Sequence, residues 1–218
     1  MQDTLFPAII CCVIIMVDIF QGGLMRYPVY IDNYRPATRA GSLTFDLLVL
    51  VSSSLLIAAL SQLEFFVPFS PVPVTGQTFA VLAVGLLLGS TGGASAVLLY
   101  LAEGSMGLPF FAGGSAGVHH FIGPTGGYLL GFVGAAYLAG LFSEIGFTRN
   151  FPVMFAALSL ADLSLYIFGV LWLSSFVGRE HAVQLGFFPF IFGDLVKILL
   201  LSLSFPLFRK SAVAEERT

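Results

Sequence analysis

Two charged side chains, Asp194 and Lys197, lie in an otherwise uncharged, largely apolar run that extends from Leu185 to Phe208. They are three residues apart, so on a helix they share one face about one turn from each other. If the run crosses a bilayer, each charge costs roughly 2.5–3.5 kcal/mol at the membrane centre. Such charges are accommodated where they face a protein cavity and meet each other or a ligand. The pair is therefore a candidate site for a small polar ligand, and the alternative is an ion pair that only fixes helix packing.

The composition is that of an integral membrane protein. Hydrophobic residues make up 57% of the 218 residues and charged residues only 10%, whereas a soluble globular domain carries about 25% charged residues. The length allows six or seven helices with short connections and no separate soluble domain. A net charge of −3 does not indicate a nucleic-acid partner. The two cysteines, Cys11 and Cys12, are neighbours in an apolar run and form neither a disulfide framework nor a metal-ligand set.

Residues 1–42 are predicted to be a hydrophobic segment followed by a polar linker. The segment Leu5–Phe20 is marginal in length for a membrane span and lacks the basic start of a signal peptide. The linker, residues 26–42, carries two prolines and three arginines, which favour the cytoplasmic side. Two interpretations stay open for the segment: a seventh, peripheral helix, or an over-long start, since Met25 can also initiate.

The rest of the chain predicts an all-α membrane domain of six helices over residues 43–210, followed by a cytoplasmic tail, residues 211–218. The predicted spans are Leu43–Glu64, Thr78–Gly89, Ala94–Glu103, a helix that follows Gly123, Pro152–Val177 and the helix that carries Asp194. Three prolines within residues 67–78 favour an extended, stiff loop after the first of these helices.

The second and third spans are short, so they could also form one long helix. The distribution of basic residues favours a hairpin. With a hairpin, only Arg179 lies on the outer side, and the residues that share the inner side are Arg26, Arg35, Arg39, Arg149, Arg209, Lys210 and Arg217. A single merged helix would split these charges between both sides.

A glycine-rich stretch, residues 104–131, is the second candidate part of a site. It contains no Lys or Arg, which argues against a phosphate-binding loop. Gly113 and Gly114 permit close approach of the main chain to a ligand, next to Ser115. The interleaved aromatic residues indicate a loop that folds into the protein. His119 and His120 have only one further histidine in the chain, so we interpret them as loop residues rather than zinc ligands.

Small and polar residues on other helices complete the set of candidates. From Gly123, small residues recur every fourth position through Ala139, which predicts a close-packing stripe on the fourth span. Asp162 is a second intramembrane carboxylate, and Tyr166 stands one turn further on the same face. Trp172 is either an interface anchor or a pocket residue.

Five motifs in order give the chain from about Thr44 to Lys210 a close resemblance to the biotin-specific S components of energy-coupling factor (ECF) transporters, the BioY family. They are Pro71-Val-Pro-Val-Thr-Gly-Gln-Thr, Gly107-Leu-Pro-Phe-Phe-Ala-Gly-Gly, Gly123-Pro-Thr-Gly-Gly-Tyr-Leu-Leu-Gly-Phe, Tyr166-Ile-Phe-Gly-Val-Leu-Trp-Leu and Gly193-Asp-Leu-Val-Lys. Residues 1–40 fall outside the resemblance. One position departs from it: many members of the family carry an arginine in the glycine-rich loop where this chain has Ser115.

The resemblance implies biotin uptake across the cytoplasmic membrane, by a six-helix protein that is not an enzyme and needs no cofactor. It also implies a complex with a membrane coupling subunit and two ATPases, although some members are thought to work alone. Ser54 and Ala58 on the first core helix, four residues apart, are the predicted contact with the coupling subunit because small residues let helices approach closely. No ATP-binding motif is present in the chain, so a partner or a gradient must supply the energy.

Biotin also fits the chemistry of the candidate residues. Its ureido ring offers two N–H donors and one carbonyl, which suits a carboxylate such as Asp194. Lys197, the only Lys or Arg inside a predicted span, either faces the biotin carboxylate or stabilises Asp194. The apolar part of biotin would lie against aromatic residues such as Phe110, Tyr128 and Tyr166. Other small anionic vitamins would suit the same description, and a membrane enzyme or a purely structural subunit are the alternatives from other classes.

Overall fold

The computed structural model describes residues 39–66 and 70–215, and most of them are helical. The predicted segment Leu5–Phe20 and nearly all of the linker lie outside the described residues. The helices are α2 (Arg39–Ser61), α3 (Gln77–Ser105), α4 (His119–Ile122), α5 (Gly126–Glu144), α6 (Phe151–Val177), α7 (Arg179–Gly186) and α8 (Phe188–Glu215). Two 3-10 turns, η2 (Ala112–Gly114) and η3 (Phe147–Arg149), and a two-stranded antiparallel ribbon of β1 (Glu64–Phe65) and β2 (Val74–Thr75) complete the described chain.

Helix α3 is a hairpin of two helical segments, residues 77–88 and 90–105. The break is at Gly89, whose φ of 79° and ψ of −177° lie outside the helical region. A Cβ placed on Gly93 would be 2.7 Å from the Cα of Gly85, although eight residues of a continuous helix rise about 12 Å. The chain therefore reverses at Gly89, and the hairpin predicted from the charge distribution is confirmed.

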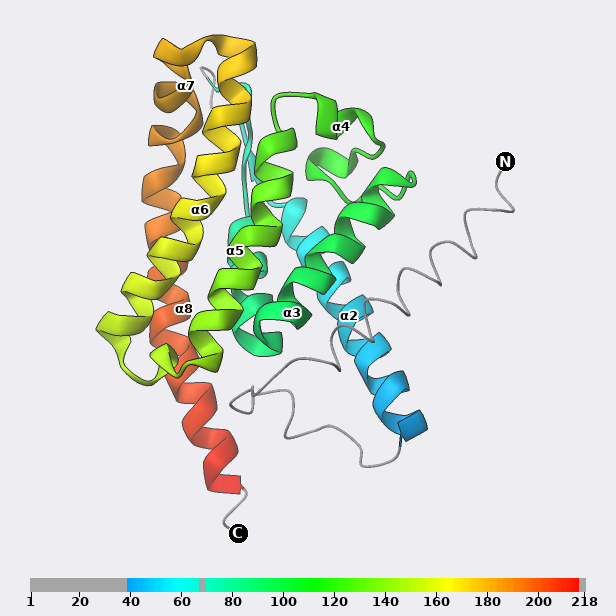
Figure 1. Ribbon diagram of the computed structural model, residues 1–218, viewed down its shortest axis with the longest axis vertical. Helices are drawn as coiled ribbons and strands as arrows, with labels where there is room; N and C mark the ends of the chain where they lie inside the picture. Colours follow the sequence, from blue (N-terminus) through cyan, green and yellow to red (C-terminus); the bar gives the residue numbers. More distant parts are fainter. Residues whose placement is uncertain (1–38, 67–69, 216–218) are drawn as a thin grey trace.

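The helices form one membrane domain of the predicted class. Among the described residues, five helical stretches are long and apolar enough to cross a membrane when α3 is counted as one of them. The break at Gly89 divides α3 in two, which gives the six segments of the core. Helix α5 packs between α3 and α6, α2 packs on α3, and α8 packs on α6. The start of α2, the turn η3 and the end of α8 lie toward one end of the molecule, whereas α4 and α7 lie toward the other (Figure 1). Arg179, at the start of α7, is thus at the end opposite the start of α2.

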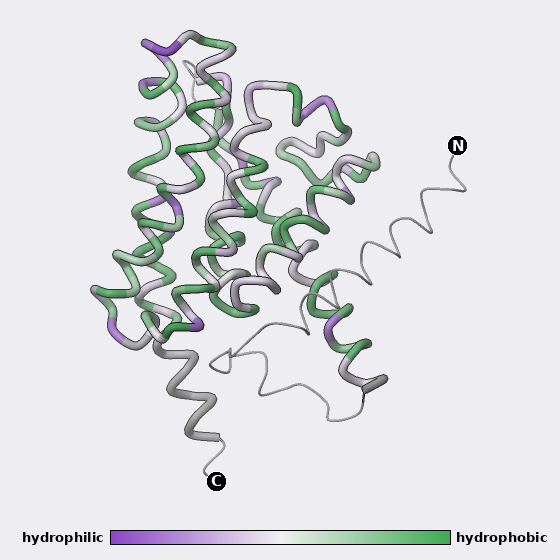
Figure 2. The backbone as a smooth tube through the Cα atoms, in the orientation of Figure 1, coloured by the Kyte–Doolittle hydropathy of each residue, from purple (hydrophilic) through white to green (hydrophobic). Residues whose placement is uncertain are grey.

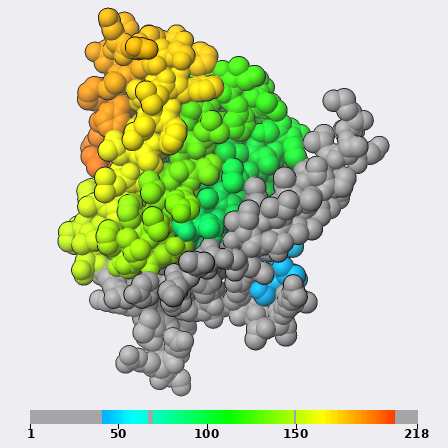
Figure 3. All heavy atoms as spheres, in the orientation of Figure 1, coloured from blue at the N-terminus to red at the C-terminus, as the bar shows by residue number. Residues whose placement is uncertain are grey.

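The helical surfaces are apolar, as a lipid environment requires. Hydrophobic residues dominate the middle of the helices, and the hydrophilic ones gather mainly near their ends (Figure 2). Much of one face is formed by α5 and α6 (Figure 3). On α6, Leu160, Ile167 and Leu171 are each more than half exposed, which places lipid-facing side chains on this helix.

The small-residue stripe on α5 packs closely, as predicted. A Cβ placed on Gly131 would lie 2.9 Å from the carbonyl oxygen of Leu165, and one placed on Gly127 would lie 2.6 Å from that of Phe168, both on α6. Ala135 and Ala139 are fully buried. Glycine and alanine at these positions let the backbones of α5 and its neighbours approach closely, which drives helix association in lipid.

Ser54 and Ala58 do not form an exposed face for a partner, which corrects the sequence prediction. Ser54 is fully buried and Ala58 is 6% exposed. The Ser54 hydroxyl donates a hydrogen bond to the carboxylate of Glu103 on α3. A half-buried carboxylate in apolar surroundings requires such a donor, so this face of α2 turns inward. The small residues do allow close packing, but the neighbour is α3 of the same chain.

Helix ends and loops differ from the prediction in detail. Helix α2 begins at Arg39 and ends at Ser61, and the chain then turns into β1. Helix α8 continues to Glu215, so most of the predicted tail is helical. The glycine-rich stretch folds onto the helices, as predicted: Phe111 is 3% exposed and belongs to the core.

Candidate ligand-binding site

A cavity of about 250 Å³ lies between the β ribbon, the glycine-rich stretch and helices α3, α5, α6 and α8. Most of its lining is apolar or aromatic, with polar side chains interspersed, which is typical of small-molecule sites. The described residues that line it are Glu64, Phe66, Val72, Pro73, Thr75, Gln77, Thr78, Phe111, Ala112, Ser115, His120, Thr125, Tyr128, Leu129, Phe132, Leu165, Tyr166, Phe190 and Lys197.

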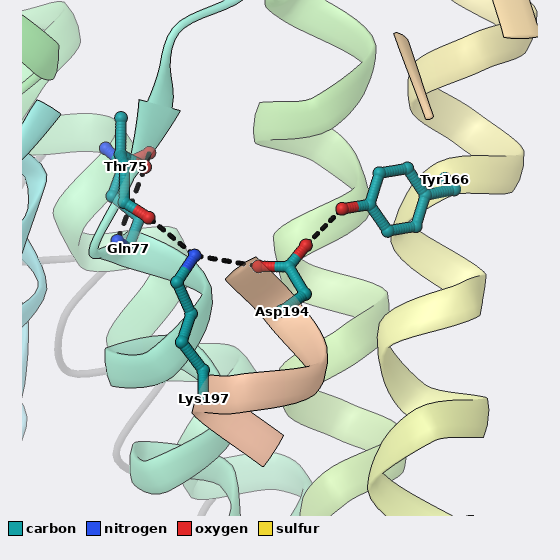
Figure 4. Close-up of polar contacts among 5 residues, drawn as sticks. All are labelled: Thr75, Gln77, Tyr166, Asp194 and Lys197. Carbon is teal, nitrogen blue, oxygen red and sulfur yellow. Dashed lines mark hydrogen bonds and ion pairs between the residues drawn. The ribbon is translucent and has the colours of Figure 1, made fainter. Parts of the chain in front are cut away.

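The predicted pair on α8 forms an ion pair beside this cavity. The Nζ atom of Lys197 lies 2.7 Å from Oδ1 of Asp194, one helical turn away. Lys197 also donates to the carbonyl oxygen of Thr75 in β2, again at 2.7 Å. The hydroxyl of Tyr166 on α6 donates to Oδ2 of Asp194. The network therefore joins α8, α6 and the β ribbon around one carboxylate (Figure 4).

Lys197 and Tyr166 line the cavity, but Asp194 does not belong to the described residues that do. Asp194 is 3% exposed, and both of its oxygens accept hydrogen bonds from within the protein. In this geometry Asp194 orients two side chains that a ligand can reach. Direct contact between Asp194 and a ligand stays a prediction, and the structure favours an indirect role.

A second series of hydrogen bonds runs through Gln77, which the sequence analysis did not assign to the site. The Thr75 hydroxyl donates to Oε1 of Gln77 at 3.2 Å, and Nε2 of Gln77 donates to the Tyr100 hydroxyl at 2.5 Å. The Tyr100 hydroxyl donates in turn to the carbonyl oxygen of Phe110 at 3.3 Å. These bonds attach the glycine-rich stretch to α3. The sequence does carry a signal for Gln77, because it lies in the polar run that follows the prolines. That run belongs to the first family motif, but the sequence analysis assigned no contact with a ligand to it.

In the glycine-rich stretch, Phe111 rather than Phe110 lines the cavity, which corrects the prediction by one residue. The carbonyl oxygen of Phe110 accepts a hydrogen bond from the Ser61 hydroxyl at 2.5 Å. The ring of Phe111 packs edge-on against Tyr100, with centroids 5.7 Å apart. The backbone of Phe110 is thus tied to α2, and the next side chain points into the core.

The two predicted glycines shape this stretch without lining the cavity in the described residues. Gly113 and Gly114 have φ values of 66° and 69°, a left-handed conformation that favours glycine. Ala112 and Ser115, on either side of them, do line it. The Ser115 hydroxyl donates to the carbonyl oxygen of Ala112 at 2.7 Å, so it closes the turn and keeps only its oxygen as an acceptor for a ligand.

Aromatic rings form one wall of the cavity. Tyr128 contacts Tyr166 edge-on, with centroids 6.3 Å apart, and Phe190 of α8 lies 6.2 Å from Tyr128. The hydroxyl of Tyr128 donates to the carbonyl oxygen of Gly186 at 2.7 Å. This bond fixes the ring, so its face rather than its hydroxyl is presented to a ligand. Tyr128 was predicted for the site, and Phe190 was not.

Asp162 lies outside the main cavity in the described structure, contrary to its predicted place in the site. It lines a second, smaller cavity of about 120 Å³ between α6 and α8. Tyr166 belongs to the linings of both cavities and separates them. Asp162 is 6% exposed, and its Oδ1 atom has no hydrogen-bond partner among the described residues. Of these two residues, which are one helical turn apart, only Tyr166 reaches the main cavity.

Trp172 is 40% exposed, and its indole N–H donates to the carbonyl oxygen of Gly123 at 3.0 Å. It does not belong to the described residues that line either cavity. The anchor interpretation is therefore favoured over the pocket interpretation, because a partly exposed indole with a polar contact is typical of a membrane interface.

The two adjacent histidines differ in their surroundings. His120 lines the cavity and packs edge-on against Phe111, with centroids 5.3 Å apart, whereas His119 is exposed. Burial first, and then the neighbouring His119, lowers the pKa of His120. The described residues contain no group of three metal-ligating side chains.

A helical membrane protein with an internal cavity beside a buried ion pair belongs to the class of small-molecule binding proteins and transporters. The BioY family model matches residues 34–213, most of the chain, and the protein therefore belongs to the BioY family. It is a multi-pass membrane protein, as the predicted fold class requires.

Named relatives agree with this assignment. A biotin transporter BioY of Rhodobacter capsulatus is 40% identical over 166 residues, which cover 68% of this chain and 86% of the relative. A probable biotin transporter BioY of Pyrococcus horikoshii is 40% identical over 131 residues, 60% of this chain and 76% of the relative. Among solved structures, the S-component for biotin from an ECF-type ABC transporter superposes with a TM-score of 0.70 at 26% identity, over 80% of this chain and 95% of that one.

Proposed function

We propose that the protein binds biotin in the main cavity and carries it across the cytoplasmic membrane as the S component of an ECF transporter. The observation that carries the proposal is the cavity itself, where Lys197 is held by Asp194 and Thr75 opposite an aromatic wall, in a chain of the BioY family. The protein is a transporter rather than an enzyme, and biotin is its cargo rather than a cofactor.

The polar groups near Lys197 suit the ureido ring of biotin. A lysine ammonium has three N–H donors, and two of those of Lys197 are used by Asp194 and Thr75. The third N–H is left for the ureido carbonyl oxygen. The ureido N–H groups need acceptors, and Tyr166 and Thr78, which line the cavity, each carry a hydroxyl oxygen that can accept. The predicted role of Asp194 is thereby revised from direct acceptor to the group that orients Lys197 and Tyr166.

The apolar part of biotin matches the aromatic lining. Tyr128, Tyr166 and Phe190 contact one another around the cavity, and their faces offer flat apolar surface to the thiophane ring. Such rings provide large contact areas at small entropic cost because their own rotamers are already fixed by packing.

The first expected result is that purified protein in detergent binds biotin saturably without ATP or another protein, because the cavity is built from one chain. Titration calorimetry with biotin measures this directly. Pantothenate, nicotinate and thiamine serve as controls, since they lack the fused ureido ring and should give no saturable heat. The absence of both heat and a thermal shift at saturating biotin would refute the proposal, and preference for another vitamin would move the protein to a different substrate.

Partners belong to the same proposal. The chain carries no ATP-binding motif, and the similar solved structure is the S-component of an ECF-type ABC transporter. We therefore propose that a membrane coupling subunit and two ATPases drive uptake. Purification from the native membrane in mild detergent should recover these chains with the protein. Uptake of biotin by a host that lacks every coupling subunit would show instead that the protein works alone.

A further inference from the structure

His120 carries a buried polar atom that nothing in the described structure satisfies. Its Nε2 atom is buried and has no hydrogen-bond partner among the described residues. Buried polar atoms are nearly always paired, and each exception calls for an explanation. The side chain lines the main cavity, so a bound ligand is the group that can reach it.

The backbone and the ring of His120 are held in place. Its amide N–H donates to the carbonyl oxygen of Gly117 at 3.3 Å, and its own carbonyl oxygen accepts from the Thr125 hydroxyl at 3.3 Å. The ring packs against Phe111, which also lines the cavity. A polar atom on a ring fixed in this way is pre-organised for a ligand, which lowers the entropic cost of binding.

The described lining of the cavity offers an anionic ligand no lysine or arginine that is not already paired with a carboxylate. Lys197 and His120 are the only residues in the described lining whose side chains can carry positive charge. Lys197 is already neutralised by Asp194 at 2.7 Å. Glu64 adds a carboxylate to the lining. The hydroxyls of Ser115 and Thr125 already donate to carbonyl oxygens of the loop, so they offer a carboxylate no hydrogen.

We infer that the Nε2–H group of His120 donates a hydrogen bond to the carboxylate of bound biotin and so selects for its acidic end. The inference rests on the proposed function, since it names the group that reads one end of the same ligand. It divides the cavity into two parts. The region of Lys197, Tyr166 and Thr78 binds the ureido ring, and the glycine-rich stretch binds the acidic end through His120.

The test compares biotin with biotin amide, which has nearly the same shape but no negative charge. His120→Phe keeps an aromatic ring against Phe111 and removes the donor. Because a hydrogen bond to a charged group is stronger than a neutral one, the affinity for biotin should fall about 10- to 100-fold, and that for biotin amide less than about 5-fold. His120→Gln restores an N–H donor and should recover part of the loss.

His119→Phe is the matched control, because His119 is adjacent and exposed and lies outside the described cavity lining. Phenylalanine also keeps a ring in the contact that His119 makes with His120, with centroids 4.3 Å apart. The substitution should leave both affinities unchanged. His120→Ala is measured in parallel, as a second variant without the donor in case His120→Phe folds poorly. Binding of biotin amide shows in each variant that the cavity is folded. Equal losses for both ligands, or no loss at all, would overturn the inference, as would the same pattern in His119→Phe. Failure of the unmodified protein to bind biotin would instead refute the proposed function.

Discussion

Asp194→Asn is expected to reduce both stability and biotin affinity more than the double variant Asp194→Asn with Lys197→Met. The single substitution leaves the Lys197 ammonium, which is largely shielded from solvent, beside a neutral amide. A fully buried uncompensated charge costs about 3–5 kcal/mol. It also weakens the bond from Tyr166, which donates to the same carboxylate. The double variant removes both charges together. Thermal stability in detergent and calorimetry with biotin measure the two effects.

Biotin and biotin amide also show which end of the ligand Lys197 contacts. Since Lys197 is neutralised by Asp194 and faces the ureido end in our proposal, Lys197→Met should weaken biotin and biotin amide equally, by about 100-fold or more if Asp194 is left unpaired. A selective loss for biotin would mean that Lys197 reads the carboxylate instead. Normal binding by all three variants would show that the ion pair only fixes helix packing.

Leu200→Ala is the matched control for these substitutions. Leu200 lies on the same helix, α8, and is 53% exposed. Its replacement removes lipid-facing surface without touching the polar network, so stability and both affinities should stay close to those of the unmodified protein. A large loss in this variant would mean that α8 as a whole is sensitive to substitution and that the effects at Asp194 are not specific.

The features that the sequence predicted correctly depend on strong local signals. The turn in α3 was predicted from the side preference of the basic residues, because a single helix would place these charges on both sides, and the structure places the break at Gly89. Asp194 and Lys197 were found because charge in an apolar helix is rare and one turn of helix brings the two together. Tyr128 and Tyr166 were found through motifs and helical spacing, and both line the cavity.

The errors come from the orientation of helices and loops, which composition does not determine. In lipid both the buried and the exposed face of a helix are apolar, so nothing in α2 alone shows that Ser54 faces inward. The decisive residue is Glu103, far away in sequence, which requires a donor. Asp162 shares a face with Tyr166, but Tyr166 lines both cavities whereas Asp162 lines only the smaller one. Phe111 rather than Phe110 lines the cavity. The backbone of Phe110 is bonded to Ser61 of another helix, a contact that the local sequence does not reveal.

The substitution Gly140→Ala is expected to destabilise the fold strongly, because α5 meets the turn of the α3 hairpin at this position. A Cβ on Gly140 would overlap the carbonyl group of Gly89 and the amide nitrogen of Ser90, all backbone atoms. The turn has little freedom to move: the Ser90 amide and hydroxyl both donate to Glu144 of α5, at 2.7 and 2.9 Å. Overpacking typically costs about 1–3 kcal/mol, and we expect the upper end, a fall of roughly 10 °C in melting temperature.

Gly134→Ala on the same helix separates this steric effect from the general effect of replacing a glycine in α5. A Cβ on Gly134 would have its nearest neighbours, Phe168 and Ser164, at 3.9 Å, which is ordinary contact. Alanine favours the helix over glycine by about 0.5–1 kcal/mol, so this variant should melt at the same temperature or slightly higher. The two proteins differ only in which glycine receives a methyl group. If Gly140→Ala melts together with Gly134→Ala, the hairpin turn does not pack against α5 as closely as the structure shows, and the fold of α3 described above is wrong at this contact.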